Sequence, residues 1–160
     1  MGTETLKIGI ELWATMWDKP PQAGLWIDDQ NHYNGEIIGT QSKPNIITFE
    51  HTFKENTEHC LTIKRGNKLP GQTVVDNDGN VLKDQLLHIK NIEIDDINLG
   101  AIVYNGIYYP EYPEPWASQQ RSMGVELVES FNNCTSMGFN GDWKLKFTSP
   151  FYLWLIDNLY

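Results

Sequence analysis

The chain has 160 residues, of which 40% are hydrophobic and 12% aromatic, and this is the size and composition of one packed globular domain. Its formal net charge of −9 repels phosphate backbones and anionic lipid, so no nucleic acid and no membrane are expected as partners. Neutral polymers, cations and basic protein surfaces remain open.

The first hundred residues alternate apolar and polar side chains with period two, the pattern of half-buried strands. Strands are predicted at 6–12, 23–27, 47–53, 61–63 and 86–94. Asn34-Gly35 is typical of a tight hairpin. The apolar positions of 86–94 change parity, which predicts a bulge near Lys90-Asn91.

From Tyr104 to Trp116 the chain is rich in aromatic residues and has three prolines in six residues. The prolines exclude a helix and a central strand, so we expect an extended arm there. Further strands are predicted at 125–131 and 143–147. The apolar segment Phe151–Tyr160 is either a tail or one to two helical turns. Together these elements predict an all-β chain forming a single jelly-roll-like β-sandwich over 1–160.

Two cysteines, Cys60 and Cys134, have no CxxC spacing and form either one disulfide or two free thiols. Residues 1–5 do not have the composition of a signal peptide. No apolar run approaches the roughly 18 residues of a membrane helix.

No standard catalytic motif is present, so we do not expect an enzyme. The four histidines lack metal-ligand spacing. One catalytic alternative remains: a small glycan-active enzyme that uses paired carboxylates such as Glu111, Glu114 or Glu126.

A candidate metal site lies in the polar stretch before residue 86. Calcium prefers several oxygen ligands on a flexible loop, and four side chains here supply them: Asp76, Asp78, Asn80 and Asp84. The same residues also make a good β-turn, because Asp, Asn and Gly favour turns. No other cofactor is expected.

The aromatic arm is the second candidate site. Its rings can stack on sugars or anchor a protein partner, and they can equally cover the chain's own core. The predicted ligand-binding residues are Tyr108, Tyr109, Tyr112, Trp116 and Asp84. The predicted interface residues are Tyr104, Tyr112, Trp116, Phe151, Tyr152, Trp154 and Tyr160.

Three stretches resemble the small calcium-dependent xylan-binding modules, over about residues 6–100. The segment Asp84-Gln-Leu-Leu-His-Ile-Lys-Asn-Ile-Glu-Ile-Asp95-Asp96 is similar to their late strand and turn. The segments Pro20-Pro21 with Leu25-Trp26-Ile27-Asp28, and His59-Cys60-Leu61-Thr62-Ile63 with Asn67, are similar to earlier strands.

This resemblance implies a sandwich fold, sugar binding and a calcium site at Asp84. Leu86 and Lys90 stand where those modules have Asn and Asp, so calcium would need Asp76 and Asp78 as replacement ligands. Residues 104–160, with their Pro-Glu-Pro-Trp texture, resemble small virion proteins of tailed marine phages.

We therefore expect a non-catalytic, carbohydrate-binding-module-like protein that decorates a phage capsid or tail. Such a chain is made in the host cytoplasm, needs no signal peptide, and binds protein subunits of a larger assembly and polysaccharide. The alternatives are a free-standing glycan-binding module, with or without calcium, and the glycan-active enzyme above.

Overall fold

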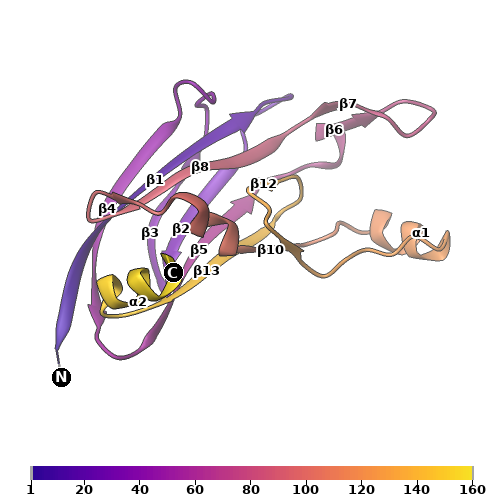
Figure 1. Ribbon diagram of the computed structural model, residues 1–160. Coiled ribbons are helices and arrows are strands. Elements are labelled where there is room, and N and C mark those ends of the chain that lie inside the picture. The colour runs from indigo at the N-terminus through magenta and orange to yellow at the C-terminus, as the bar shows by residue number, and fades with distance from the viewer. Residues whose placement is uncertain (1, 160) are drawn as a thin grey trace.

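The computed structural model describes residues 2–159 and contains two antiparallel β-sheets that face each other (Figure 1). The first sheet has the strand order β12–β8–β1–β4, and β9 also pairs with β8. Its strands are β1 (Thr3–Thr15), β4 (Asn45–Lys54), β8 (Leu86–Ile94), β9 (Ile97–Asn98) and β12 (Ser136–Met137).

The second sheet has the strand order β11–β10–β13–β5–β2–β3. Its strands are β2 (Gln22–Ile27), β3 (Gln30–Glu36), β5 (Glu58–Gly66), β10 (Ile107–Pro110), β11 (Phe131–Asn132) and β13 (Gly141–Thr148). A separate hairpin pairs β6 (Thr73–Val75) with β7 (Val81–Asp84). The predicted all-β sandwich is confirmed.

Strand β1 shows how the sequence builds the core. Leu6, Ile8 and Ile10 are buried between the sheets, while Lys7 and Glu11 line the opposite face of the same strand. Each fully buried Leu or Ile contributes about 1.5–3 kcal/mol relative to exposure. The alternation read from the sequence therefore reports which face of each strand meets the core.

The bulge predicted near Lys90-Asn91 is also confirmed. Glu11 pairs with Asn91 and Leu12 pairs with Ile89, so Lys90 is the extra residue in β8. This irregularity shifts the register and keeps Ile89 and Ile92 in the core despite their opposite parity.

The hairpin predicted at Asn34-Gly35 is wrong, because these residues lie inside β3 and pair with β2. The chain instead turns at Asp28-Asp29, where Asp28 has a φ of 49°. The Asp28 carboxylate accepts the backbone N–H of Cys60 at 2.9 Å, which holds this turn against β5. Asp tolerates the left-handed region better than most residues.

The predicted extended arm begins later than expected. Residues Gly100–Asn105 form a short 3-10 helix, and β10 lies centrally between β11 and β13. The prolines do not prevent this strand, because Pro110 is only its last residue. The arm proper spans 111–130 and includes helix α1 (Trp116–Ser122).

The strand predicted at 125–131 is wrong except at its end. Only Phe131 and Asn132 pair with a neighbour, as β11, while residues 125–130 lie outside any strand. In Figure 1 this arm projects away from the sandwich, so its apolar residues have no adjacent strand to pair with.

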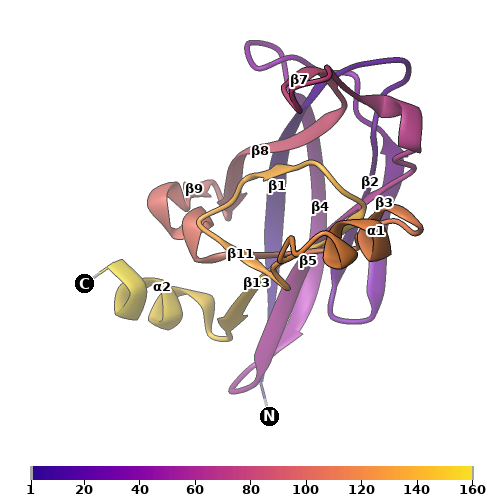
Figure 2. The same ribbon diagram turned by 90° about the vertical axis from the view of Figure 1, so that its right-hand side faces the viewer.

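The C-terminal segment forms helix α2 (Phe151–Leu159), and Tyr160 lies outside the described residues. Phe151 and Leu155 are buried against the sandwich, and Figure 2 shows α2 on the side opposite β2 and β3. Cys60 and Cys134 are both free thiols. Among residues 2–159, no helix has the length and apolar character needed to cross a bilayer.

Candidate functional site

The sandwich brings the predicted ligand residues Asp84, Tyr112 and Trp116 to the same end of the molecule. Figure 1 shows the β6–β7 hairpin and α1 there, far from α2. Two groups of side chains meet at this end. We call them the ring cluster (Tyr112, Trp116 and Phe139) and the polar cluster (Arg65, Lys68, Thr73, Asp84 and Gln85).

The ring cluster consists of three aromatic side chains in mutual contact. The ring centroid of Phe139 lies 5.0 Å from that of Tyr112 and 5.4 Å from that of Trp116. Trp116 and Tyr112 are 6.1 Å apart. Trp116 is 37% exposed, so its indole contacts Tyr112 and Phe139 and is also open to solvent.

The local sequence explains why Trp116 begins a helix at this position. The carbonyls of Pro113 and Pro115 accept the backbone N–H groups of Ala117 and Gln119 at 2.8 and 3.1 Å. Proline suits this first turn, because it has no N–H to leave unsatisfied. Ala117 is buried and anchors the turn, so the indole of Trp116 is left on the surface.

A hydrogen bond holds the two halves of the arm together. The hydroxyl of Tyr112 donates to the carbonyl of Val128 at 2.6 Å. Partial burial raises the pKa of this phenol further above neutrality, and the protonated hydroxyl is the donor. The arm is therefore a closed loop with the ring cluster at its base.

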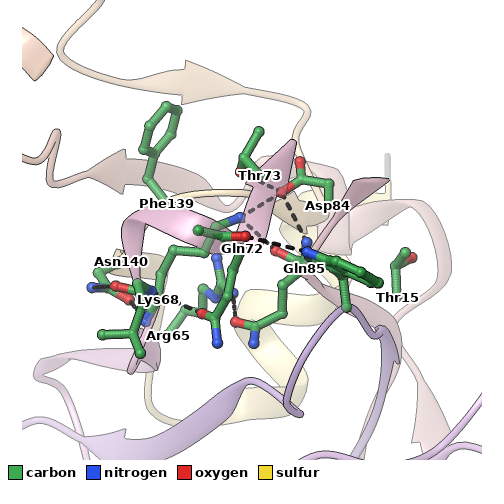
Figure 3. Close-up of polar contacts among 12 residues, drawn as sticks. Thr15, Arg65, Lys68, Gln72, Thr73, Asp84, Gln85, Phe139 and Asn140 are labelled. Atoms are coloured by element: carbon green, nitrogen blue, oxygen red, sulfur yellow. Dashed lines mark hydrogen bonds and ion pairs between the residues drawn. The ribbon is translucent and has the colours of Figure 1, made fainter. Parts of the chain in front are cut away.

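The polar cluster lies at the base of the β6–β7 hairpin, where Thr73 begins β6 and Asp84 ends β7 (Figure 3). Asp84 Oδ1 accepts hydrogen bonds from Lys68 Nζ at 2.5 Å, from Thr73 Oγ1 at 2.7 Å and from the backbone N–H of Gln85 at 2.8 Å. Lys68 Nζ also donates to the Gln85 carbonyl at 2.9 Å.

Arg65 is the buried member of this cluster. Its guanidinium donates through Nη2 to the side-chain oxygen of Gln85, and its Nε and Nη1 have no hydrogen-bond partner within residues 2–159. Burial lowers the pKa of Arg65 to about 10, so the group still carries its charge at neutral pH. Arg65 and Lys68 thus place two positive charges beside the single carboxylate of Asp84.

One residue links the polar cluster to the ring cluster. The backbone N–H of Lys68 donates to Asn140 Oδ1 at 2.8 Å, and Asn140 follows Phe139 directly in the chain. Figure 3 shows Asn140 beside Lys68. The loop that carries Lys68 and the loop that carries Phe139 therefore form one unit.

Two predicted ligand residues, Tyr108 and Tyr109, lie on opposite faces of β10. Tyr108 is only 2% exposed, and its hydroxyl donates to the Phe139 carbonyl at 2.5 Å, so it is a core residue and not a surface ligand. Tyr109 is exposed on the outer face, with Lys144 Nζ 5.9 Å from its ring centroid.

The predicted interface residues also include both buried and exposed side chains. Phe151 is fully buried and Trp154 is partly buried against the core, so neither contributes a fully open surface. Tyr104 and Tyr152 are exposed, and the Tyr152 hydroxyl donates to Asp95 Oδ2 at 2.8 Å.

Asp76, Asp78 and Asn80 form a β-turn of their own. Asp76 Oδ1 accepts the backbone N–H groups of Asp78 and Asn80, both at 2.9 Å. These hydrogen bonds lower the pKa of Asp76. The carboxylate thus stabilises the turn between β6 and β7, as Asp commonly does at the start of a turn.

Calcium was the one candidate metal, and the residues at Asp84 do not fit it. Within the described part of the chain, no three His, Cys, Asp or Glu side chains are grouped closely enough to hold a metal ion. Asp84 is the only carboxylate of the polar cluster, and calcium prefers six to eight oxygen ligands. The charges of Arg65 and Lys68 would in addition repel a divalent cation.

A hollow of about 210 Å³ lies elsewhere, on the outer face of the first sheet. Its lining residues are Lys7, Gly9, Glu11, Ile46, Thr48, Glu93 and Asp96. No aromatic ring lines it, so it offers no stacking surface to a sugar. It also contains none of the carboxylates Glu111, Glu114 and Glu126 considered for catalysis.

The sequence alone did not identify Lys68, Arg65 or Phe139 as members of the site. For Arg65 the sequence does contain an indication of burial, because Arg65 continues the alternation of the buried residues Leu61 and Ile63 on β5. Phe139 follows Gly138 in a loop outside the arm, and Lys68 is one of 12 basic residues, so neither has a local signal.

No protein-family model and no curated protein matches this chain. Among solved structures, the chain is similar to vCBM60, a calcium-dependent carbohydrate-binding module. The complex of vCBM60 with galactobiose has a TM-score of 0.46 at 9% identity, over 86% of this chain and 95% of that chain. The selenomethionine form of vCBM60 has a TM-score of 0.48 at 7% identity, over 87% of this chain and 88% of that chain.

Proposed function

We propose that this protein is a non-catalytic glycan-binding module and that the ring cluster is its contact surface. The observation that carries the proposal is the indole of Trp116, which is open to solvent on one side and held by Phe139 and Tyr112 on the other. A rigid, partly exposed ring loses little entropy when the apolar face of a sugar stacks on it.

Polar groups for the sugar hydroxyls lie in the same arm. Glu111 and Glu114 are exposed on either side of Tyr112, and Glu114 accepts a hydrogen bond from the Ser118 hydroxyl. Carboxylates and hydroxyls beside an apolar platform give the orientation and specificity that small-molecule sites require. The sequence resemblance of residues 6–100 to xylan-binding modules supports the same ligand class.

Truncating the ring tests this proposal. Trp116→Ala should lower the affinity for a bound polysaccharide by about tenfold or more, because hot-spot aromatic residues carry most of the energy of such contacts. Tyr104→Ala is the matched control, since Tyr104 is an exposed ring outside the cluster. Binding would be measured on a glycan array and then by calorimetry. Equal affinities for both variants, or no bound glycan, would refute the proposal.

A second candidate function, protein–protein contact in a larger assembly, is favoured by helix α2. The helix buries Phe151 and Leu155, yet it also exposes four large side chains: Tyr152, Leu153, Ile156 and Leu159. Contiguous exposed apolar side chains commonly mark an interface. A place on a phage particle, as capsid decoration or tail component, is supported by the sequence texture of residues 104–160.

Assembly can be tested separately from glycan binding. Leu153→Ser with Ile156→Ser removes exposed apolar surface and leaves the buried face of α2 intact. If α2 mediates contacts, the purified protein sediments as an oligomer and this double variant as a monomer. A wild-type chain that is strictly monomeric at high concentration would contradict self-assembly through α2.

A further inference from the structure

The polar cluster has a positively charged group at the position where the sequence resemblance placed a calcium ion. Lys68 Nζ lies 2.5 Å from Asp84 Oδ1 and 2.9 Å from the Gln85 carbonyl, so it contacts the carboxylate that a metal would need and an adjacent backbone oxygen. In both contacts the positively charged ammonium lies next to an oxygen atom, as a metal ion lies next to its oxygen ligands.

The surroundings keep this ammonium in place. The side chain of Lys68 is 10% exposed and that of Asp84 is 22% exposed, so water screens their interaction less than it would on the open surface. Burial lowers the pKa of Lys68, whereas the hydrogen bond and charge of Asp84 raise it. The neighbouring guanidinium of Arg65 adds a second positive charge and leaves no local excess of negative charge for a metal.

The contacts of Lys68 also join separate elements. Its side chain reaches Asp84 at the end of β7 and the carbonyl of Gln85, the residue between β7 and β8. Its backbone contacts Asn140, beside Phe139 of the ring cluster. A bound cation in a loop-rich site would make the same kind of cross-link between hairpin and loops.

From these contacts we infer that the Lys68 ammonium is the built-in structural cation of this end of the sandwich, and that ligand binding there requires no divalent metal. The second half of this inference rests on the glycan-binding function proposed above; the first half does not.

Calcium titration of the wild-type protein tests the inference without any glycan. A site with a Kd of about 0.1 mM would raise the melting temperature by roughly 5–10 °C at about 10 mM CaCl2, and it would give a saturable heat in calorimetry. We expect no shift and no saturable heat. Either signal would overturn the inference.

Removing the ammonium tests its structural role. Lys68→Met keeps the length of the side chain and leaves the Asp84 carboxylate without its cation, so the melting temperature should fall by roughly 5–10 °C. Lys68→Arg should recover most of that loss. Lys64→Met is the matched control, because Lys64 is exposed on the same chain segment and has no ion pair within residues 2–159. Equal melting temperatures for Lys68→Met and Lys64→Met would overturn the role. If Lys68→Met cannot be purified while Lys68→Arg and Lys64→Met can, the requirement for a cation at position 68 is supported.

Glycan affinity measured in EGTA and in CaCl2 separates the two proposals. Equal affinity in both supports the inference. Binding that needs CaCl2 would overturn the inference and leave the glycan-binding function standing. Absence of binding in both would refute that function, while the calcium titration and the melting temperature of Lys68→Met would still test the role of Lys68.

Discussion

The histidine pair His32–His51 should make the stability of this protein depend on pH. His32 on β3 and His51 on β4 lie on the edge strands of the two different sheets, and Nε2 of His32 is 2.8 Å from Nδ1 of His51. The ring of His32 also stacks on Phe49, with 4.3 Å between centroids. At this distance the two nitrogens share one proton, so the contact is lost when both rings are protonated.

The direction of the effect follows from the pKa values. Burial lowers the pKa of His32. For His51, burial is the largest cause of a lowered pKa, His32 and His59 lower it further, and Asp28 raises it. A histidine whose pKa is lower in the folded state binds protons preferentially when unfolded. Stability is therefore complete above the unfolded pKa of about 6.5 and falls as the pH drops toward the folded pKa values.

The size of the effect has an upper limit. Each histidine that stays neutral while its unfolded counterpart titrates contributes a slope of about 1.4 kcal/mol per pH unit, or about 2.7 kcal/mol for the pair. Both rings are only partly buried, so water screens part of this effect. We expect the pair to account for a loss of about 1 kcal/mol between about pH 7.5 and pH 5.5.

Urea unfolding at several pH values measures this loss. The control is the double variant His32→Gln with His51→Gln, which can keep a hydrogen bond between the two side chains but cannot titrate. Its free energy of unfolding should fall less steeply than that of the wild type over the same range. Parallel pH profiles for the two proteins would show that the pair does not govern acid sensitivity.

Two further predictions concern the fold and the arm. Gly106→Ala should lower the free energy of unfolding by about 3 kcal/mol or more, because the added Cβ meets the ring of buried Trp143. Gly71→Ala is the control, because its added Cβ meets no neighbouring atom and the substitution should be nearly neutral. Urea unfolding of both variants measures the difference. Tyr112→Phe removes the hydrogen bond to Val128 and should lower the free energy of local opening of the arm by about 1 kcal/mol. Proteolysis within 111–130 should then become faster while the melting temperature of the whole protein stays almost unchanged. An unchanged cleavage rate would contradict the closed-loop description of the arm.

The sequence predicts the sandwich well where a strand has one buried face. From Leu6 onward in β1, and throughout β13, every second residue enters the core, so alternation alone identifies the strand and its inner face. The same signal fails at 125–130, where apolar residues are present but pair with no neighbouring strand, and only Phe131 pairs, with β10. Period two indicates that a segment can form a strand, but pairing depends on the rest of the fold.

The candidate site was harder to predict, because its members come together only in three dimensions. Tyr108 and Tyr109 are adjacent and chemically identical, yet one is buried and the other exposed, and composition does not distinguish them. The ring cluster joins Trp116 to Phe139, and the polar cluster joins Lys68 to Asp84 across the β6–β7 hairpin. Such contacts depend on loop conformation, which has no periodic signal.

The net charge of the whole chain does not predict the charge around an individual carboxylate. A chain with a formal charge of −9 is expected to attract cations, and four Asp and Asn residues near position 80 strengthened that expectation. In the structure, the Asp76 carboxylate is used by its own turn, and Asp84 is paired with Lys68 beside the buried charge of Arg65. The negative charges that make the protein acidic are spread elsewhere over its surface. Whether a carboxylate can bind a metal is therefore decided by the charges within a few ångströms of it, and at Asp84 those charges are positive.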